Sequence, residues 1–141
     1  MTAEELPVRV RPIEDGDRAF VIDSWVRSYK ASPWGRVTRD SYHDGHDALA
    51  KRLLARSLCI VACWESDPAT ILGWSCIEGG AVHYVYVKQK FRRQGIAKLL
   101  LAGFLGDRGI RYSHPPFSAD PEVPAIRVPD GWIFDPYAAM G

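Results

Sequence analysis

The sequence predicts one α/β domain over residues 1–141, in which helices flank a mixed, mostly antiparallel sheet. Three observations support this fold class. The chain has 141 residues, 47% of them hydrophobic and 25% charged, which suits a single folded core. Stretches with apolar residues at every second position alternate with stretches of helical period. Six of the ten prolines fall in residues 115–141, so the core is expected at 8–114 and an irregular tail behind it.

The amino-terminal part predicts a strand followed by two helices. Residues 8–13 alternate apolar and charged side chains, as a half-buried strand does. A first helix covers residues 17–29 and ends before a Ser-Pro-Trp-Gly sequence, which breaks helices. The second helix begins at Asp44 or Asp47, and its basic residues, Arg56 among them, are expected to face solvent. The residues expected in the core recur at helical spacing: Val21, Ile22, Trp25, Val26, Tyr29, Leu49, Leu53 and Leu54.

The middle of the chain predicts three antiparallel strands. Residues 58–64 and 70–77 are apolar runs separated by the turn-like sequence Glu-Ser-Asp-Pro. A third strand covers residues 81–88. Gly79 and Gly80 join it to the second strand, because a two-residue hairpin turn needs positive φ angles that glycine tolerates.

A loop and an amphipathic helix follow the third strand directly. The helix begins near Gly95, and a short strand is expected at residues 110–114. Within the proline-rich segment one further short strand is expected at residues 132–134. The apolar residues that share one face of the helix are Ile96, Leu99, Leu100 and Phe104.

Charge and cysteine content exclude several classes of protein. The net charge is +1, which gives no overall attraction to nucleic acid or anionic lipid. The amino terminus is too polar for a signal peptide and no apolar run is long enough to span a bilayer, so a cytoplasmic protein without a membrane partner is expected. Cys59, Cys63 and Cys76 lie in apolar runs and are expected to be buried, reduced thiols. No metal is expected, although a zinc site formed by Cys59 and Cys63 with His83 and His114 stays open as the alternative.

Residues 83–98 carry the strongest chemical signal. A helix amino terminus has free backbone N–H groups and a partial positive charge, and glycine lets a phosphate approach it closely. Gly95 lies where that approach occurs. The segment is neither a Walker loop nor a three-glycine dinucleotide loop, so nucleoside triphosphates and NAD are disfavoured. Local charge also favours a polyanion, because residues 86–111 contain Asp107 as their one acid against Lys88, Lys90, Arg92, Arg93, Lys98, Arg108 and Arg111.

The sequence Arg92-Arg93-Gln94-Gly95-Ile96-Ala97 resembles the Arg/Gln-x-x-Gly-x-Gly/Ala pyrophosphate loop of the GCN5-related N-acetyltransferases. It follows an apolar strand and begins an amphipathic helix, as in that family, and the order of predicted elements is similar over residues 8–114. The resemblance implies the acyl-CoA N-acyltransferase fold and acetyl-CoA as acyl donor. It implies that backbone amides hold the pyrophosphate, with Arg92 at the start of the loop. The residues implied to supply these amides are Arg93, Gln94, Gly95, Ile96, Ala97 and Lys98.

The strand before this loop has an implied role too. In such enzymes its backbone groups bind the pantetheine arm, here those of Val85, Tyr86 and Val87, and one N–H polarises the acyl carbonyl, for which Val85 is the candidate. Thioester cleavage then needs an oriented carbonyl and an unprotonated amine more than a covalent enzyme intermediate. The resemblance therefore implies direct transfer of acetyl to a primary amine in a ternary complex.

Three residues are candidates for proton transfer. His83 is the predicted general base, because histidine titrates near neutral pH and its offset from Gly95 resembles that of a water-linked base in arylalkylamine N-acetyltransferase. The alternative for His83 is a packed strand histidine. Glu78 is the next candidate, with an exposed hairpin residue as its alternative. Tyr137 is the predicted acid for the leaving thiolate, because the proline-rich segment replaces the helix that carries this tyrosine in the family; Tyr84 and Tyr112 are the other candidates.

Two alternative functions and several partners stay open. The chain can be a CoA-binding sensor or accessory subunit without turnover, which the missing last helix favours. It can also be a related protein of viral origin that modifies nucleobases, with Trp34, Tyr84 and Tyr86 stacking on bases. The expected acceptor is a small-molecule or peptide amine, and an exposed edge strand in the tail can pair two copies into a homodimer.

Overall fold

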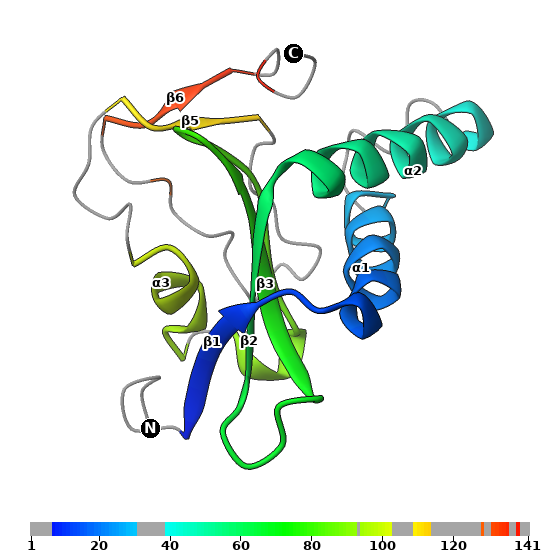
Figure 1. Ribbon diagram of the computed structural model, residues 1–141. Coiled ribbons are helices and arrows are strands. Elements are labelled where there is room, and N and C mark those ends of the chain that lie inside the picture. Colours follow the sequence, from blue (N-terminus) through cyan, green and yellow to red (C-terminus); the bar gives the residue numbers. More distant parts are fainter. Residues whose placement is uncertain are drawn as a thin grey trace.

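The computed structural model describes residues 7–30, 39–92, 94–102, 109–113, 128, 131–135 and 138. A central sheet has α1 and α2 on one face and α3 on the other (Figure 1). The helices are α1 (Arg18–Lys30), α2 (Arg39–Arg56) and α3 (Ile96–Leu100), with short 3₁₀ turns η1 (Asp15–Asp17) and η2 (Gln89–Phe91). The strands are β1 (Val8–Pro12), β2 (Leu58–Trp64), β3 (Ile71–Glu78), β4 (Ala81–Val87), β5 (Arg111–Tyr112) and β6 (Ile133–Phe134).

The strand order in the sheet follows the order in the chain, from β1 to β6. Strands β1 to β4 are antiparallel, whereas β5 runs parallel to β4 and β6 parallel to β5. The predicted mixed, mostly antiparallel sheet is therefore confirmed. In the turn between β3 and β4, Gly79 has a positive φ of +56° as predicted, whereas the φ of Gly80 is not positive. The strand expected at residues 132–134 is present as β6, at the edge of the sheet.

Aromatic side chains fill the layer between the sheet and the α1–α2 pair. Trp25 of α1 lies against Trp74 of β3 with ring centroids 5.2 Å apart, and both are fully buried. Tyr84 of β4 stacks on both rings. On the other face, Ile96 and Leu100 of α3 pack with buried apolar residues of the sheet. The predicted core residues of the helices that are buried are Val21, Trp25, Val26, Leu53 and Leu54.

Helix α2 ends at Arg56 as predicted, but it differs from its prediction in where it begins and in the surroundings of Arg56. It begins at Arg39, before the predicted Asp44 or Asp47, because residues 39–46 carry no apolar period that marks a helix in the sequence. At its other end, Arg56 does not face solvent as predicted. Its Nε lies 2.9 Å from Glu78 Oε2 of β3, which ties the end of α2 to the sheet. The predicted helical position of Phe104 falls outside the described residues.

The three cysteines are free and buried, as predicted. Burial raises the pKa of Cys59 to about 12 and that of Cys76 to about 11, so both thiols stay protonated near neutral pH. Within the part of the chain that the structure describes, no helix combines the length and apolar character needed to span a bilayer. No group of three or more metal-ligating side chains occurs among the same residues, and His114 lies outside them.

A bidentate ion pair fixes the connection between β1 and α1. The Arg11 guanidinium donates to both oxygens of Asp17, at 2.7 and 3.1 Å, and to the Pro68 carbonyl at 2.8 Å. Asp17 also accepts the Glu14 backbone N–H at 2.8 Å. The hydrogen bonds from Arg11 hold the pKa of Asp17 below its usual value. Both side chains are largely buried, so neither charge is compensated by water if the other is removed.

Replacing Asp17 with Asn is expected to lower the free energy of unfolding by about 3 kcal/mol at pH 7, because the largely buried Arg11 guanidinium loses the carboxylate that neutralises it. The pKa of Asp17 is lower in the folded state, so the contribution is present above the unfolded-state value of about 3.9 and is lost as pH falls through the folded value. Denaturant unfolding of both proteins at pH 7 and pH 3 measures this. The difference in the free energy of unfolding between wild type and Asp17→Asn should be smaller at pH 3 than at pH 7. An equal difference at the two pH values contradicts the proposed role of the ion pair.

Candidate functional site

The candidate site begins where β4 and β5 stop pairing. The parallel ladder joins Ala81 to Arg111 and Val82 to Tyr112. Its last hydrogen bond runs from the Ser113 N–H to the Val82 carbonyl, at 3.2 Å. Within the described residues, no strand pairs with the later part of β4 on this side. The two parallel strands therefore form a fork, and backbone groups of β4 line its open side.

The register of β3 and β4 determines which residues face the fork. The Lys88 N–H donates to the Leu72 carbonyl at 2.9 Å. Opposed residues of an antiparallel pair alternate between hydrogen-bonded and non-hydrogen-bonded positions, so Tyr86 pairs with β3 while Val85 and Val87 turn their N–H and C=O groups away from it. The Val87 carbonyl already accepts Arg92 Nε at 2.9 Å. Val85 is thus the predicted pantetheine-binding residue whose backbone is most open, and Tyr86 faces β3 instead.

A tight turn follows β4 and leads into α3. Gly95 precedes the helix with a φ of +83°, a left-handed conformation that favours glycine. No side chain caps the helix, so the N–H groups of Ile96, Ala97 and Lys98 have no partner within it. The Ile96 side chain is buried in the core, which holds the turn, whereas Lys98 is exposed. Gln94 is half-buried, and Arg93 lies outside the described residues.

A hydrogen-bonded network lies beside the fork. His83 Nδ1 is 2.8 Å from Ser113 Oγ, and His83 Nε2 is 3.0 Å from Glu78 Oε1. Arg56 Nε lies 2.9 Å from the second oxygen of the same carboxylate, Glu78 Oε2. Four elements therefore contribute to one chain of contacts: α2, the end of β3, β4 and the residue after β5. A β-bulge between Cys76 and Ile77, opposite residues 82–84, places His83 as the extra residue of β4.

The charges in this network are set by its hydrogen bonds. The bond from His83 is the largest cause that lowers the pKa of Glu78, and the charge of Arg56 lowers it further. Glu78 is therefore ionised near neutral pH. Its carboxylate is shared between His83 and Arg56, and its side chain, next to the β3–β4 turn, is still 34% exposed.

Neither a family model nor a curated protein matches the sequence. Solved structures do match it. One is the apo form of YjaB from Escherichia coli, which is 17% identical with a TM-score of 0.53; the match covers 68% of this chain and 63% of that one. Another is a GCN5-related N-acetyltransferase from Rhodopseudomonas palustris, 15% identical with a TM-score of 0.52, covering 71% of this chain and 64% of that one. The chain has the fold of the GCN5-related N-acetyltransferases. It spans slightly less than two thirds of both matched structures.

The acyltransferase fold brings the predicted proton-transfer residues together only in part. His83 and Glu78 are in direct contact, whereas Tyr137 lies outside the described residues. The other tyrosine candidates have structural partners: Tyr84 Oη is 2.6 Å from Ser28 Oγ, and Tyr112 packs on Phe134. Tyr84 and Tyr86 stack on Trp74 in the core, so their rings give no support to base stacking by a nucleic-acid partner.

Two residues of the network, Ser113 and Arg56, were missed by the sequence analysis. Ser113 is 30 residues from His83 in the chain, and only the parallel pairing of β4 with β5 brings them together. The one signal in the sequence is that Ser113 lies within the short strand predicted at residues 110–114. Arg56 was predicted to face solvent, because a basic residue at the end of an amphipathic helix usually does so.

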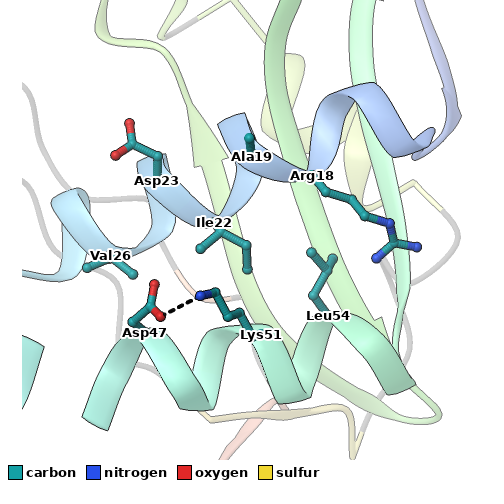
Figure 2. A pocket seen from close by; sticks show the side chains of 8 residues that line it. All are labelled: Arg18, Ala19, Ile22, Asp23, Val26, Asp47, Lys51 and Leu54. Carbon is teal, nitrogen blue, oxygen red and sulfur yellow. Dashed lines mark ion pairs between the residues drawn. The ribbon is translucent and has the colours of Figure 1, made fainter. Parts of the chain in front are cut away.

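A hollow of about 460 Å³ on the acyltransferase fold lies away from the fork, between α1 and α2. Figure 2 shows the ion pair of Asp47 and Lys51, 2.9 Å apart, beside the apolar side chains of Ile22 and Leu54. All residues that line the hollow belong to the two helices, and none is among those predicted to bind the donor or to transfer a proton. The candidate site is therefore the fork with its adjoining turn.

Proposed function

We propose that the protein transfers an acetyl group from acetyl-CoA to a primary amine by direct attack in a ternary complex. The observation that carries this proposal is the fork, where the Val85 backbone groups on the edge of β4 have no partner among the described residues and the strand leads into the turn at Gly95. An extended pantetheine arm can pair with such an edge as a further strand does. A diphosphate fits N–H groups that have no partner within α3 and the close backbone approach at Gly95.

The residues of the fork are proposed to do three things for the donor. Val87 and Val85 lie on the open side of β4, where their backbone groups hold the arm in an extended form. The Val85 N–H is proposed to polarise the acyl carbonyl, since a fixed donor stabilises the oxyanion that develops during attack. Ile96, Ala97 and Lys98 offer their N–H groups to the diphosphate, and Lys98 adds a positive charge.

The amine acceptor must lose a proton before it can react. An alkylamine is mostly protonated at pH 7, so attack on the thioester requires that a proton leave the nitrogen. His83 is the proposed base, and it lies beside the fork with Glu78 as its carboxylate partner. This pairing supports the proposal, because an ionised carboxylate stabilises the imidazolium that forms when the ring takes up a proton.

Replacing Gly95 with Ala is expected to raise the Kd for CoA at least about tenfold, because a side chain strains the left-handed turn and fills the space that a diphosphate approaches. Calorimetric titration with CoA measures this. Gly109→Ala is the matched control, since Gly109 has a φ of +76° with no atom within 4 Å of the place that an added methyl would take, and it lies outside the turn. Unchanged affinity in Gly95→Ala, or equal losses in both variants, would argue against the proposed diphosphate site.

One observation favours a second candidate function. His83 is only 1% exposed and both of its ring nitrogens have partners, which also fits a CoA-binding protein without turnover. The two functions differ in their products. Incubation with acetyl-CoA and a panel of primary amines releases free thiol if the protein is an acetyltransferase, whereas a binding protein gains thermal stability from CoA and releases none.

A further inference from the structure

The partners of His83 restrict how it can exchange a proton. The residue is 1% exposed, so its ring does not meet bulk water. Each ring nitrogen lies within hydrogen-bonding distance of one side chain, Nε2 of Glu78 Oε1 at 3.0 Å and Nδ1 of Ser113 Oγ at 2.8 Å. A base must present an unprotonated nitrogen to the proton that it accepts. The question is therefore which nitrogen carries the lone pair.

The charge of Glu78 answers this question. Its carboxylate contacts the Arg56 guanidinium at 2.9 Å, and its pKa is lowered by His83 and Arg56. An ionised carboxylate only accepts hydrogen bonds, so Nε2 must carry the hydrogen in this pair. In the neutral ring Nδ1 then holds the lone pair, and it accepts the hydroxyl hydrogen of Ser113.

We propose that Ser113 is the route by which His83 takes up and returns protons, so that the base acts through the serine hydroxyl. This inference rests on the proposed acetyl transfer. Ser113 follows β5 at the closed end of the fork, where its N–H bonds the Val82 carbonyl, and the residue is 5% exposed beside His83. Among the described residues, the charged or titratable groups around the relay include Glu78, Arg56 and the Cys76 thiol, which is opposite Tyr84 in the sheet.

The proposed step balances without a further reactant. An alkylammonium ion first gives one nitrogen proton to Ser113 Oγ while the serine's own hydroxyl proton passes to His83 Nδ1, and Glu78 stabilises the imidazolium. The neutral amine nitrogen then attacks the thioester carbonyl carbon and a C–N bond forms. The C–S bond breaks, the same relay returns its proton to the thiolate, and the second nitrogen proton leaves the protonated amide for solvent water. The products are the amide, CoA thiol and one released proton, and Ser113 performs the role that was predicted for Tyr137.

Two serine variants and two amines test the relay in the full chain. Ser113→Ala removes the hydroxyl, whereas Ser113→Thr keeps it. With acetyl-CoA and 2-phenylethylamine, which is protonated at pH 7, Ser113→Ala is expected to lower kcat about a hundredfold and Ser113→Thr less than about tenfold. With aniline, which is unprotonated at pH 7, the loss in Ser113→Ala should be less than about fivefold, because less of the barrier depends on proton removal.

Several results would overturn the relay. Full activity of Ser113→Ala with both amines shows that the hydroxyl is not needed. Equal losses with both amines show a structural role instead. An acetyl group found on Ser113 by mass spectrometry after incubation with acetyl-CoA shows that the serine acts as a nucleophile.

A second measurement needs no acyl donor and separates this inference from the proposed function. Nitrogen-15 NMR of the histidine rings, with His83 assigned by comparison with His83→Gln among the four histidines, reports which ring nitrogen is protonated. The relay predicts a neutral ring protonated at Nε2 in the wild type. A ring protonated at Nδ1 overturns it. If the wild type acetylates neither amine, the proposed function fails. The NMR measurement then still decides whether the lone pair of the His83 ring is on Nδ1, facing Ser113.

Discussion

Replacing Gly73 with Ala is expected to remove at least about 2 kcal/mol of the free energy of unfolding, because the added methyl has no space. A Cβ at this position would lie 2.5 Å from the Tyr86 carbonyl oxygen and 3.2 Å from Val87 Cα. Both atoms belong to the backbone of β4, which cannot move aside as a flexible side chain can. A shift of β4 there also displaces the edge that is proposed to bind the pantetheine arm. Thermal unfolding should show a Tm lower by about 8 °C or more.

Gly80→Ala provides the matched control for this prediction. Gly80 lies in the turn between β3 and β4, its φ is not positive, and no atom lies within 4 Å of an added Cβ. Its replacement is expected to change the free energy of unfolding by less than about 1 kcal/mol. If Gly73→Ala is as stable as Gly80→Ala, then Gly73 of β3 does not lie as close to the backbone of β4 as the structure shows.

Replacing His83 with Gln is expected to lower kcat for acetyl transfer to an alkylamine by about 10²- to 10⁴-fold, the usual contribution of a general base. The Kd for CoA should stay within about threefold of the wild type, because the proposed contacts to the diphosphate lie on the separate turn at Gly95. Steady-state kinetics and calorimetry on the same preparations measure the two quantities.

The split between rate and affinity is what distinguishes a base from a packing residue. A variant that loses CoA affinity together with rate, or that has an altered unfolding transition, places His83 in the structural role that was its alternative. Full activity with 2-phenylethylamine would exclude it as the base.

The main elements of the fold could be predicted because their signals are local. Residues 58–64 and 81–88 have the apolar character of buried strands, and Gly79 marks the turn before the latter. The early start of α2 could not be predicted, since residues 39–46 are polar and carry no period. Parallel pairing of β6 with β5 was also beyond the sequence, because no local pattern specifies which neighbour a two-residue strand takes.

In the candidate site, too, features formed by neighbouring residues could be predicted, whereas contacts between distant segments could not. The turn at Gly95 was predictable because its glycine and the helix after it are adjacent in the chain. The contact of His83 with Ser113 was not, because it depends on a parallel pairing between distant segments. The bulge at His83 was not predictable either, and it interrupts the alternation on which assignments of strand faces rest.

Backbone amide NMR during a titration with CoA tests the central claim most directly. The fork and turn are expected to bind the ligand through main-chain groups, which this measurement observes one residue at a time. The account predicts that the largest shifts occur at Val85, Val87 and residues 94–98, with small shifts in α1 and α2. Absence of any shift at saturating CoA, or shifts confined to the hollow between α1 and α2, would contradict it.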